Sequence, residues 1–93
     1  MSPTSPQATV KFVADRPFAE PEAAARKLLD IVRASIAASG LPHAYTGVTN
    51  ILFLRAGGAL DDYAAGRDFA TAQKWFEIDR SGTRIVLLSD GAE

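Results

Sequence analysis

Residues 75–87, with the sequence WFEIDRSGTRIVL, predict a β-hairpin around which the rest of the chain can be arranged. If Ser81 and Gly82 are the central turn residues, Asp79 stands opposite Arg84 and pairs opposite charges. Cross-strand partners point to the same side of a sheet. This register therefore gathers four apolar side chains on one face: Phe76, Ile78, Ile85 and Leu87. Shifting one strand by one residue would set apolar against polar partners, which favours the unshifted register.

A long amphipathic helix is predicted from Pro21 to Ser39. Proline suits the first helical position because its missing N–H would be unsatisfied there in any case. Gly40 can end the helix, and Pro42 prevents it from resuming. At helical spacing one side collects Ala24, Ala25, Leu28, Leu29, Ile31, Val32, Ser35 and Ile36. This side is expected to pack on the core, and the charged side to face water.

The middle of the chain predicts a short strand followed by a short helix. Ala44–Val48 reads as the strand, and Thr49 or Asn50 can cap a helix over Ile51–Ala56. Gly57-Gly58 ends that helix at little steric cost. Its four consecutive apolar residues exceed what one helical face can hide. This short helix is therefore either buried nearly all round or in contact with a second chain.

A third helix is predicted from about Leu60 to Lys74, directly before the hairpin. Asp61 and Asp62 in its first turn and Lys74 in its last turn suit the helix dipole. Its apolar side holds Ala59, Tyr63, Gly66, Phe69, Ala70 and Phe76. Its outer side holds Ala64, Arg67, Asp68, Thr71 and Lys74.

The length of 93 residues fits a single domain. Residues 1–8 are rich in Ser, Pro and Thr and are expected to be a disordered lead-in. Directly after it, Thr9–Val13 reads as an edge strand or an extended arm. The expected organisation is one domain over residues 9–89 and a short tail over 90–93.

The composition excludes several classes of protein. The chain has no cysteine, which rules out disulfides, thiolate zinc sites and cysteine nucleophiles and favours a cytoplasmic location. No stretch approaches the roughly 18 apolar residues of a membrane span, and residues 1–6 do not read as a signal peptide. Ten basic residues face eleven acidic ones, a balance that argues against a generic polyanion binder.

The predicted order is helix, short strand, short helix, Gly-Gly turn, helix and β-hairpin, from about Pro21 to Ser89. It resembles the winged helix-turn-helix fold, in which a recognition helix is followed directly by two strands whose loop is the wing. The expected class is α+β: a three-helix winged-helix-like domain with a C-terminal antiparallel β-hairpin. Residues 62–66, Trp75-Phe76 and 81–83 also look like those of a group of small uncharacterised bacterial proteins, which adds no known activity.

By position, the resemblance makes Leu60–Lys74 the recognition helix and Asp79–Arg84 the wing. Such helices usually enter the major groove, which implies double-stranded DNA as the partner. The first functional interpretation is therefore a winged-helix-type DNA-binding or regulatory domain. The residues implied to contact it are Arg67, Thr71, Lys74, Arg80 and Arg84. The sequence departs from a good DNA binder because Asp61, Asp62 and Asp68 lie on the same helix. Phosphate neutralisation dominates DNA affinity, so these acids would weaken binding.

Simpler interpretations of these residues stay open. The cations of the third helix can be an ordinary solvated face, and Arg84 can simply pair across the hairpin with Asp79. A second functional interpretation keeps the fold but makes it a protein–protein interaction module, including a homodimer. The interface residues are then Ile51, Leu54, Val86 and Leu88.

No pattern indicates catalysis, a metal site or a cofactor, so the sequence predicts a protein that is not an enzyme. His43 has no second histidine or cysteine to act with. Asp61 and Asp62 are adjacent, point about 100° apart on a helix and do not converge on one atom. Gly57-Gly58 lacks the spacing of a phosphate-binding loop. A small enzyme or ligand carrier is the interpretation ranked last.

Overall fold

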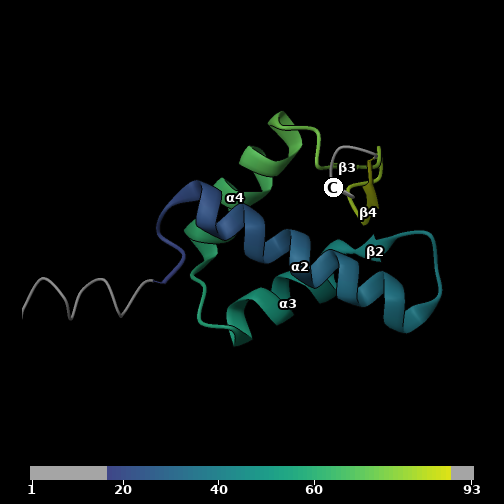
Figure 1. The fold of residues 1–93 in the computed structure, drawn as a ribbon, viewed down its shortest axis with the longest axis horizontal. Helices are drawn as coiled ribbons and strands as arrows, with labels where there is room; N and C mark the ends of the chain where they lie inside the picture. The colour runs from purple at the N-terminus through teal and green to yellow at the C-terminus, as the bar shows by residue number, and fades with distance from the viewer. Residues whose placement is uncertain (1–16, 89–93) are drawn as a thin grey trace, which may run out of the picture.

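The part of the chain described by the structure, a computed structural model, is residues 17–88, and it forms three helices and a three-stranded antiparallel sheet. The elements are α2 (Pro21–Ser39), β2 (Ala44–Tyr45), α3 (Thr46–Arg55), α4 (Leu60–Ala72), β3 (Phe76–Ile78) and β4 (Arg84–Leu87) (Figure 1). The predicted α+β class is therefore present. The predictions for residues 1–8, Thr9–Val13 and 90–93 lie outside the described residues.

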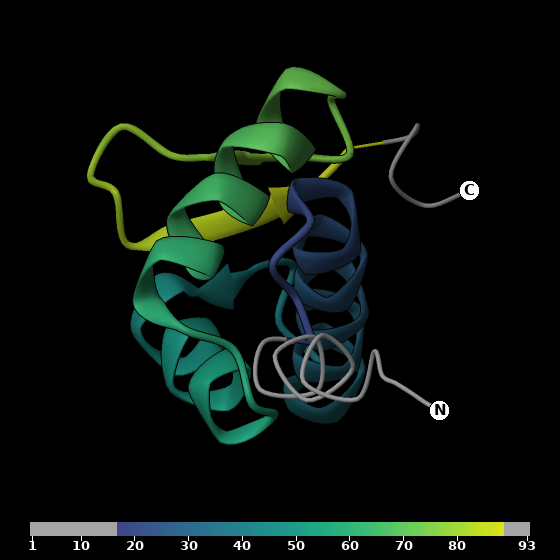
Figure 2. The ribbon, with the colours of Figure 1, turned by 90° about the vertical axis from the view of Figure 1, so that its left-hand side faces the viewer.

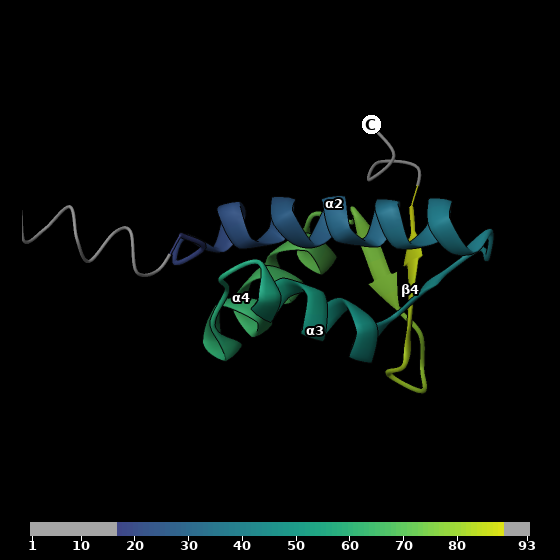
Figure 3. The same ribbon diagram turned by 90° about the horizontal axis from the view of Figure 1, so that it is seen from below.

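Helix α2 has the bounds that the sequence predicts and buries most of the predicted face, of which Ser35 and Ile36 are half-buried. Its buried residues are Ala24, Ala25, Leu28, Leu29, Ile31 and Val32. At its end Gly40 takes a left-handed φ of 74°, and its N–H donates to the Ile36 carbonyl at 2.9 Å. Figures 2 and 3 show α2 along one side of the molecule, with α3, α4 and the sheet on the other.

The core is shared by all the longer elements. Its largest fully buried side chains are Leu28, Val32, Thr49, Phe53, Phe76 and Ile85. They come from α2, α3, β3 and β4, and the buried Ala70 of α4 and Ala44 of β2 join the same core cluster. Burying a large apolar side chain stabilises a fold by about 1.5–3 kcal/mol, and this shared interior therefore binds the helices to the sheet.

Helices α2 and α4 approach each other closely at Gly66. A Cβ at this position would lie 2.7 Å from the Ala24 Cβ and 3.0 Å from the Ala25 backbone nitrogen. These distances are too short for any side chain, because the nearest atoms include backbone that cannot rotate away. A glycine against two alanines is thus what lets the two helices pack in direct contact.

Strands β3 and β4 pair in the predicted register. The partners are Phe76 with Leu87, Glu77 with Val86, and Ile78 with Ile85. The turn itself differs from the prediction: the Gly82 N–H bonds the Asp79 carbonyl at 2.9 Å, so Arg80 and Ser81 occupy the centre. Gly82 follows with a φ of 80°. The register survives because four residues separate Asp79 from Arg84 in either arrangement.

Strand β2 adds a third strand beside β4, which gives the sheet order β2-β4-β3. The sequence predicted a strand over Ala44–Val48 and a helix from Ile51, but the strand stops at Tyr45 and α3 begins at Thr46. The Thr46 N–H donates to the Thr83 carbonyl at 2.9 Å, which ends the pairing and starts the helix. Glycine and β-branched residues have low helix propensity, which is why the first turn of α3 was assigned wrongly.

Helix α4 ends at Ala72, two residues before the predicted end at Lys74. Lys74 lies beyond the helix in a left-handed conformation with a φ of 63°. The N–H groups of Lys74 and Trp75 donate to the carbonyls of Thr71 and Ala70, the pattern of a Schellman cap. This cap turns the chain out of α4 and directly into β3.

The close helix contact predicts opposite effects for two Gly→Ala variants. Gly66→Ala is expected to destabilise the fold by about 1–3 kcal/mol, because the added methyl overlaps the backbone of α2. Gly47→Ala, in α3, meets nothing within 4 Å and is expected to be neutral or to stabilise by about 0.5 kcal/mol through helix propensity. Urea unfolding of both variants measures the difference. Equal effects of the two substitutions would contradict the close packing of α2 on α4.

Candidate interaction surfaces

The first candidate surface lies where α4, the start of α3 and the hairpin turn meet. They enclose a cleft of about 390 Å³ lined by Thr46, Gly47, Asn50, Tyr63, Arg67, Ile78 and Gly82. The Thr46 hydroxyl donates to the Gly82 carbonyl at 2.9 Å, which fixes the turn against α3. The Oδ1 atom of Asn50 is buried and has no hydrogen-bond partner. We refer to this region as the α4–hairpin surface.

Arg67 is the cation of this cleft. Its guanidinium carbon lies 5.9 Å from the centre of the Tyr63 ring, and its Nε atom lies 3.5 Å from the Asp68 carboxylate. The Tyr63 hydroxyl donates to the Thr46 carbonyl at 3.4 Å. Burial raises the pKa of Tyr63 above its ordinary value, and the charge of Arg67 opposes that rise. The Tyr63 ring and the Asp68 carboxylate therefore already position the Arg67 guanidinium in the free protein.

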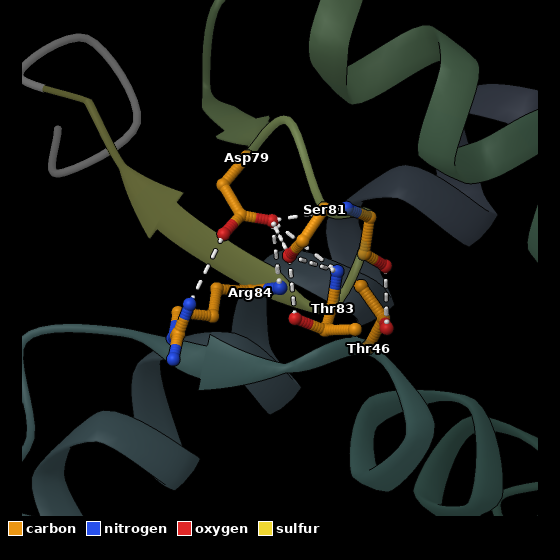
Figure 4. Close-up of polar contacts among 6 residues, drawn as sticks. Thr46, Asp79, Ser81, Thr83 and Arg84 are labelled. Atoms are coloured by element: carbon orange, nitrogen blue, oxygen red, sulfur yellow. Dashed lines mark hydrogen bonds and ion pairs between the residues drawn. The ribbon is translucent and has the colours of Figure 1, made fainter.

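The hairpin turn is organised by the carboxylate of Asp79 (Figure 4). Its Oδ1 atom accepts a hydrogen bond from the Ser81 hydroxyl at 2.8 Å. The same oxygen accepts from three backbone N–H groups, those of Gly82, Thr83 and Arg84, at 3.1–3.2 Å. The Ser81 hydrogen bond, helped by those of Arg84 and Thr83, lowers the pKa of Asp79. The Asp79 carboxylate therefore satisfies one hydroxyl and three backbone N–H groups of the turn.

The predicted nucleic-acid residues are only partly brought together. Arg67 and Thr71 lie one turn apart on α4, as expected, but the Thr71 hydroxyl donates to the Arg67 carbonyl. Lys74 is off the helix and does not share its face. Arg84 pairs with Asp79, with its Nη1 atom 3.4 Å from the Asp79 Oδ2.

Arg80 is exposed near the tip of the turn. Two exposed acids, Asp61 and Asp68, lie on α4. Asp62, by contrast, is buried, and its Oδ2 atom accepts from the Ala59 N–H at 3.4 Å at the start of the helix. The α4–hairpin surface thus mixes both signs of charge and has no continuous row of cations.

The second candidate surface is the outer side of α3. Thr49 and Phe53 are buried, but four large apolar side chains face outward. Their exposed fractions are 48% for Val48, 53% for Ile51, 38% for Leu52 and 38% for Leu54. The sequence left two alternatives for this apolar run: burial nearly all round, or contact with a second chain. Within the described residues 17–88 the run is not buried all round, so the first alternative is wrong there. We refer to these four residues as the α3 ridge.

A groove adjoins the α3 ridge. It has a volume of about 340 Å³ and is lined by Ser35, Ala38, Ser39, Leu41, His43, Ala44, Tyr45 and Val48. Leu41 and Tyr45 are 40% and 43% exposed, and Val48 belongs to both groove and ridge. The sequence prediction missed this groove because it assigned residues 44–48 to a strand. Apolar residues at positions 48, 51 and 52, at helical spacing, were the available signal.

The other two residues of the predicted partner interface lie elsewhere. Val86 is 37% exposed and pairs with Glu77 on the face of the sheet turned away from the core. Leu88 is half-buried, and its N–H donates to the Trp75 carbonyl at 3.1 Å. The predicted set of four is therefore split: Ile51 and Leu54 share the α3 ridge, whereas Val86 and Leu88 belong to the hairpin.

His43 lies half-buried in the groove, where its ring meets that of Tyr45 edge-on at 5.0 Å between centres. Its Nε2 atom is buried and has no hydrogen-bond partner. Within residues 17–88 no group of three or more His, Cys, Asp or Glu side chains is placed to hold a metal ion. In the same range, no helix has the length and apolar character needed to cross a membrane.

Comparisons with protein-family models, with curated proteins and with solved structures find no match to this chain. The two surfaces are therefore interpreted from their own geometry and chemistry.

The Asp79 contacts predict a pH-dependent turn. Because the folded-state pKa of Asp79 is depressed, its contribution to stability is present above the ordinary Asp pKa, about 3.9, and is lost as the pH falls through the folded-state value. Carboxyl ¹³C titration by NMR should place the pKa of Asp79 below that of the urea-unfolded chain. In Ser81→Ala the pKa should rise, since the largest cause of the shift is removed. An unchanged pKa in that variant would contradict the assignment.

Proposed function

We propose that this chain is a winged-helix-type protein–protein interaction module with no enzymatic activity, and that the α3 ridge and its groove form the binding face. The observation that carries the proposal is the exposure of Val48, Ile51, Leu52 and Leu54 on one ten-residue helix. Single exposed apolar residues are ordinary on protein surfaces, but contiguous apolar patches mark sites of interaction.

The order of the elements supports the winged-helix-type assignment. A helix, a short strand, two helices joined by a tight turn and then two strands follow one another, and the first strand pairs beside the last. On this assignment α3 and α4 form the helix-turn-helix, and the turn between Asp79 and Arg84 takes the place of the wing. On this assignment the turn lies against α3, through Thr46, and faces α4 across the cleft lined by Arg67.

Charge favours a polypeptide over DNA as the partner. The α4–hairpin surface carries exposed Asp61 and Asp68, and its cations Arg67 and Arg84 lie 3.5 Å and 3.4 Å from carboxylates. A DNA phosphate would have to compete with these acids for the same guanidinium groups, and phosphate contacts supply most of DNA affinity. The α3 ridge has no such competitor, because α3 contains no acidic residue and a single basic one, Arg55.

Binding of double-stranded DNA is the second candidate, favoured by one specific observation. Arg67 from α4 and Gly82 from the hairpin turn line the same cleft, so helix and turn are close enough to contact one phosphate backbone together. Arg80 is exposed at the tip of that turn. In this alternative α4 enters the major groove and the turn contacts the adjacent strand.

A dye-binding experiment tests the α3 ridge as a binding face. The fluorescent probe anilinonaphthalene sulfonate should bind the folded protein, and Ile51→Ser should lower its signal by about half or more by dividing the apolar patch. The control is Leu60→Ser, since Leu60 is more exposed, at 64%, but lies on α4. Both variants should unfold at nearly the parent urea concentration. Equal loss of signal in both variants, or no loss in Ile51→Ser, would contradict the proposal.

Titration with duplex DNA separates the two candidates. The amide signals of Arg67, Thr71 and Arg80 are expected to stay unmoved when a mixed-sequence duplex is added to the ¹⁵N-labelled protein at about 20 mM salt, where electrostatic binding is strongest. Shifts at all three residues that disappear as salt is raised would favour the DNA candidate. In that case Arg67→Ala should lower the slope of log affinity against log salt by about one.

A further inference from the structure

We infer that the partner of the α3 ridge is a second copy of this chain, in a two-fold dimer in which the ridge of each copy lies in the groove of the other. This inference rests on the proposed function, because it names the occupant of the same face. It is carried by four features of the described residues: the ridge, the groove, their common residue and their charge.

The ridge has the spacing of a helix-packing surface. Val48, Ile51 and Leu52 are separated by three and four residues, which places them next to one another on the outside of α3. Ile51 is the most exposed of the three, at 53%. A row of aliphatic side chains at this spacing is the kind of ridge that packs into the groove of another helix pair.

The groove has the shape and chemistry to receive such a side chain. Its volume is about 340 Å³, and among the described residues that line it none is Asp, Glu, Lys or Arg. Ala38 on α2 and Leu41, Tyr45 and Val48 beyond it supply the apolar wall. An aliphatic side chain that enters from outside would exchange water for apolar contacts on several sides.

Ridge and groove are continuous through Val48, so one surface of this chain is both the projecting and the receiving part. In a two-fold dimer the same patch is used on both subunits and must be complementary to itself. A surface with a projection one helical turn away from a recess meets this condition. A partner with a different sequence would need a groove of its own to receive the α3 ridge. A second copy of this chain already has that groove.

Charge permits the pairing. Arg55 is the one charged residue of α3, and in antiparallel pairing centred near Ile51 the two Arg55 residues lie at opposite ends. Their separation along the helix axis is then about 12 Å. That distance exceeds the screening length of about 8 Å at physiological salt, so their repulsion is small. The net charge of −1 likewise leaves little repulsion between whole molecules.

The patch sets the strength of the dimer. Stable dimers bury about 800 Å² on each partner. The exposed side chains of the ridge and groove rim, each between 38% and 53% exposed, form a smaller patch than that. The expected dimer is therefore weak, with a dissociation constant on the order of 100 µM.

Sedimentation velocity over about 10 µM to 1 mM protein tests the inference, because this range brackets the expected dissociation constant. The parent protein should shift from monomer to dimer, and Ile51→Glu should remain a monomer throughout. The matched control is Leu60→Glu, an equal change at a more exposed apolar residue of α4, which should dimerise like the parent. A parent protein that stays monomeric, or equal loss of dimer in both variants, would overturn the inference.

The orientation is tested by spin labelling, since the chain has no cysteine of its own. Arg55→Cys carrying a nitroxide label, mixed with unlabelled ¹⁵N protein, should broaden the Leu41 and Tyr45 amides of the second copy. Broadening confined to Ala56–Gly58 would indicate parallel pairing and overturn the ridge-in-groove arrangement. A parent protein that is monomeric but still shows Ile51-dependent dye binding would reject the second copy and leave the proposed binding face standing.

Discussion

The close approach of α2 and α4 is the constraint on which the rest of the structure depends. Gly66 removes the side chain that would otherwise meet Ala24 and the backbone of Ala25. Because the two helices are this close, the chain leaves α4 and enters β3 beside the core. Helix α2 packs against the other elements of the core. A wider separation would leave Phe76 and Ile85 without the apolar face of α2 on which to pack. Small residues therefore set the spacing, and the large core residues fill the space that this spacing leaves.

A second set of contacts connects the hairpin turn to α3 and holds the turn in shape. Thr46 bonds the Gly82 carbonyl through its hydroxyl and the Thr83 carbonyl through its N–H. On the other side Asp79 holds the turn in shape through backbone and side-chain hydrogen bonds. The turn is therefore fixed to α3. Helix α3 contributes residues both to the cleft beside Arg67 and to the α3 ridge.

The sequence predicted the features that rest on periodicity. The bounds of α2 and the pairing of Phe76 with Leu87 follow from apolar spacing and opposed charges, and both are found. The start of α3 could not be predicted, because tertiary hydrogen bonds to the turn override the weak helix propensity of residues 46–49. The left-handed Lys74 was missed for a similar reason, since lysine gives no local signal for that conformation. Exposure of the α3 ridge was left open, because an apolar run alone does not say which neighbours cover it.

The order of the sheet has a consequence for how it assembles. Strand β3 joins β4 across a short turn, with Ile78 opposite Ile85, whereas β2 meets the same strand through Ala44 opposite Ile85, from roughly forty residues away. Closing the longer loop costs about 1.5 kcal/mol more in chain entropy, and only two residue pairs repay it. The hairpin is therefore the early, local event of folding and β2 the late one. In the native protein β2 is held to β4 by two residue pairs, against three for β3, and Ala44 and Tyr45 of β2 also line the groove, so any opening of this edge of the sheet would open one wall of the groove.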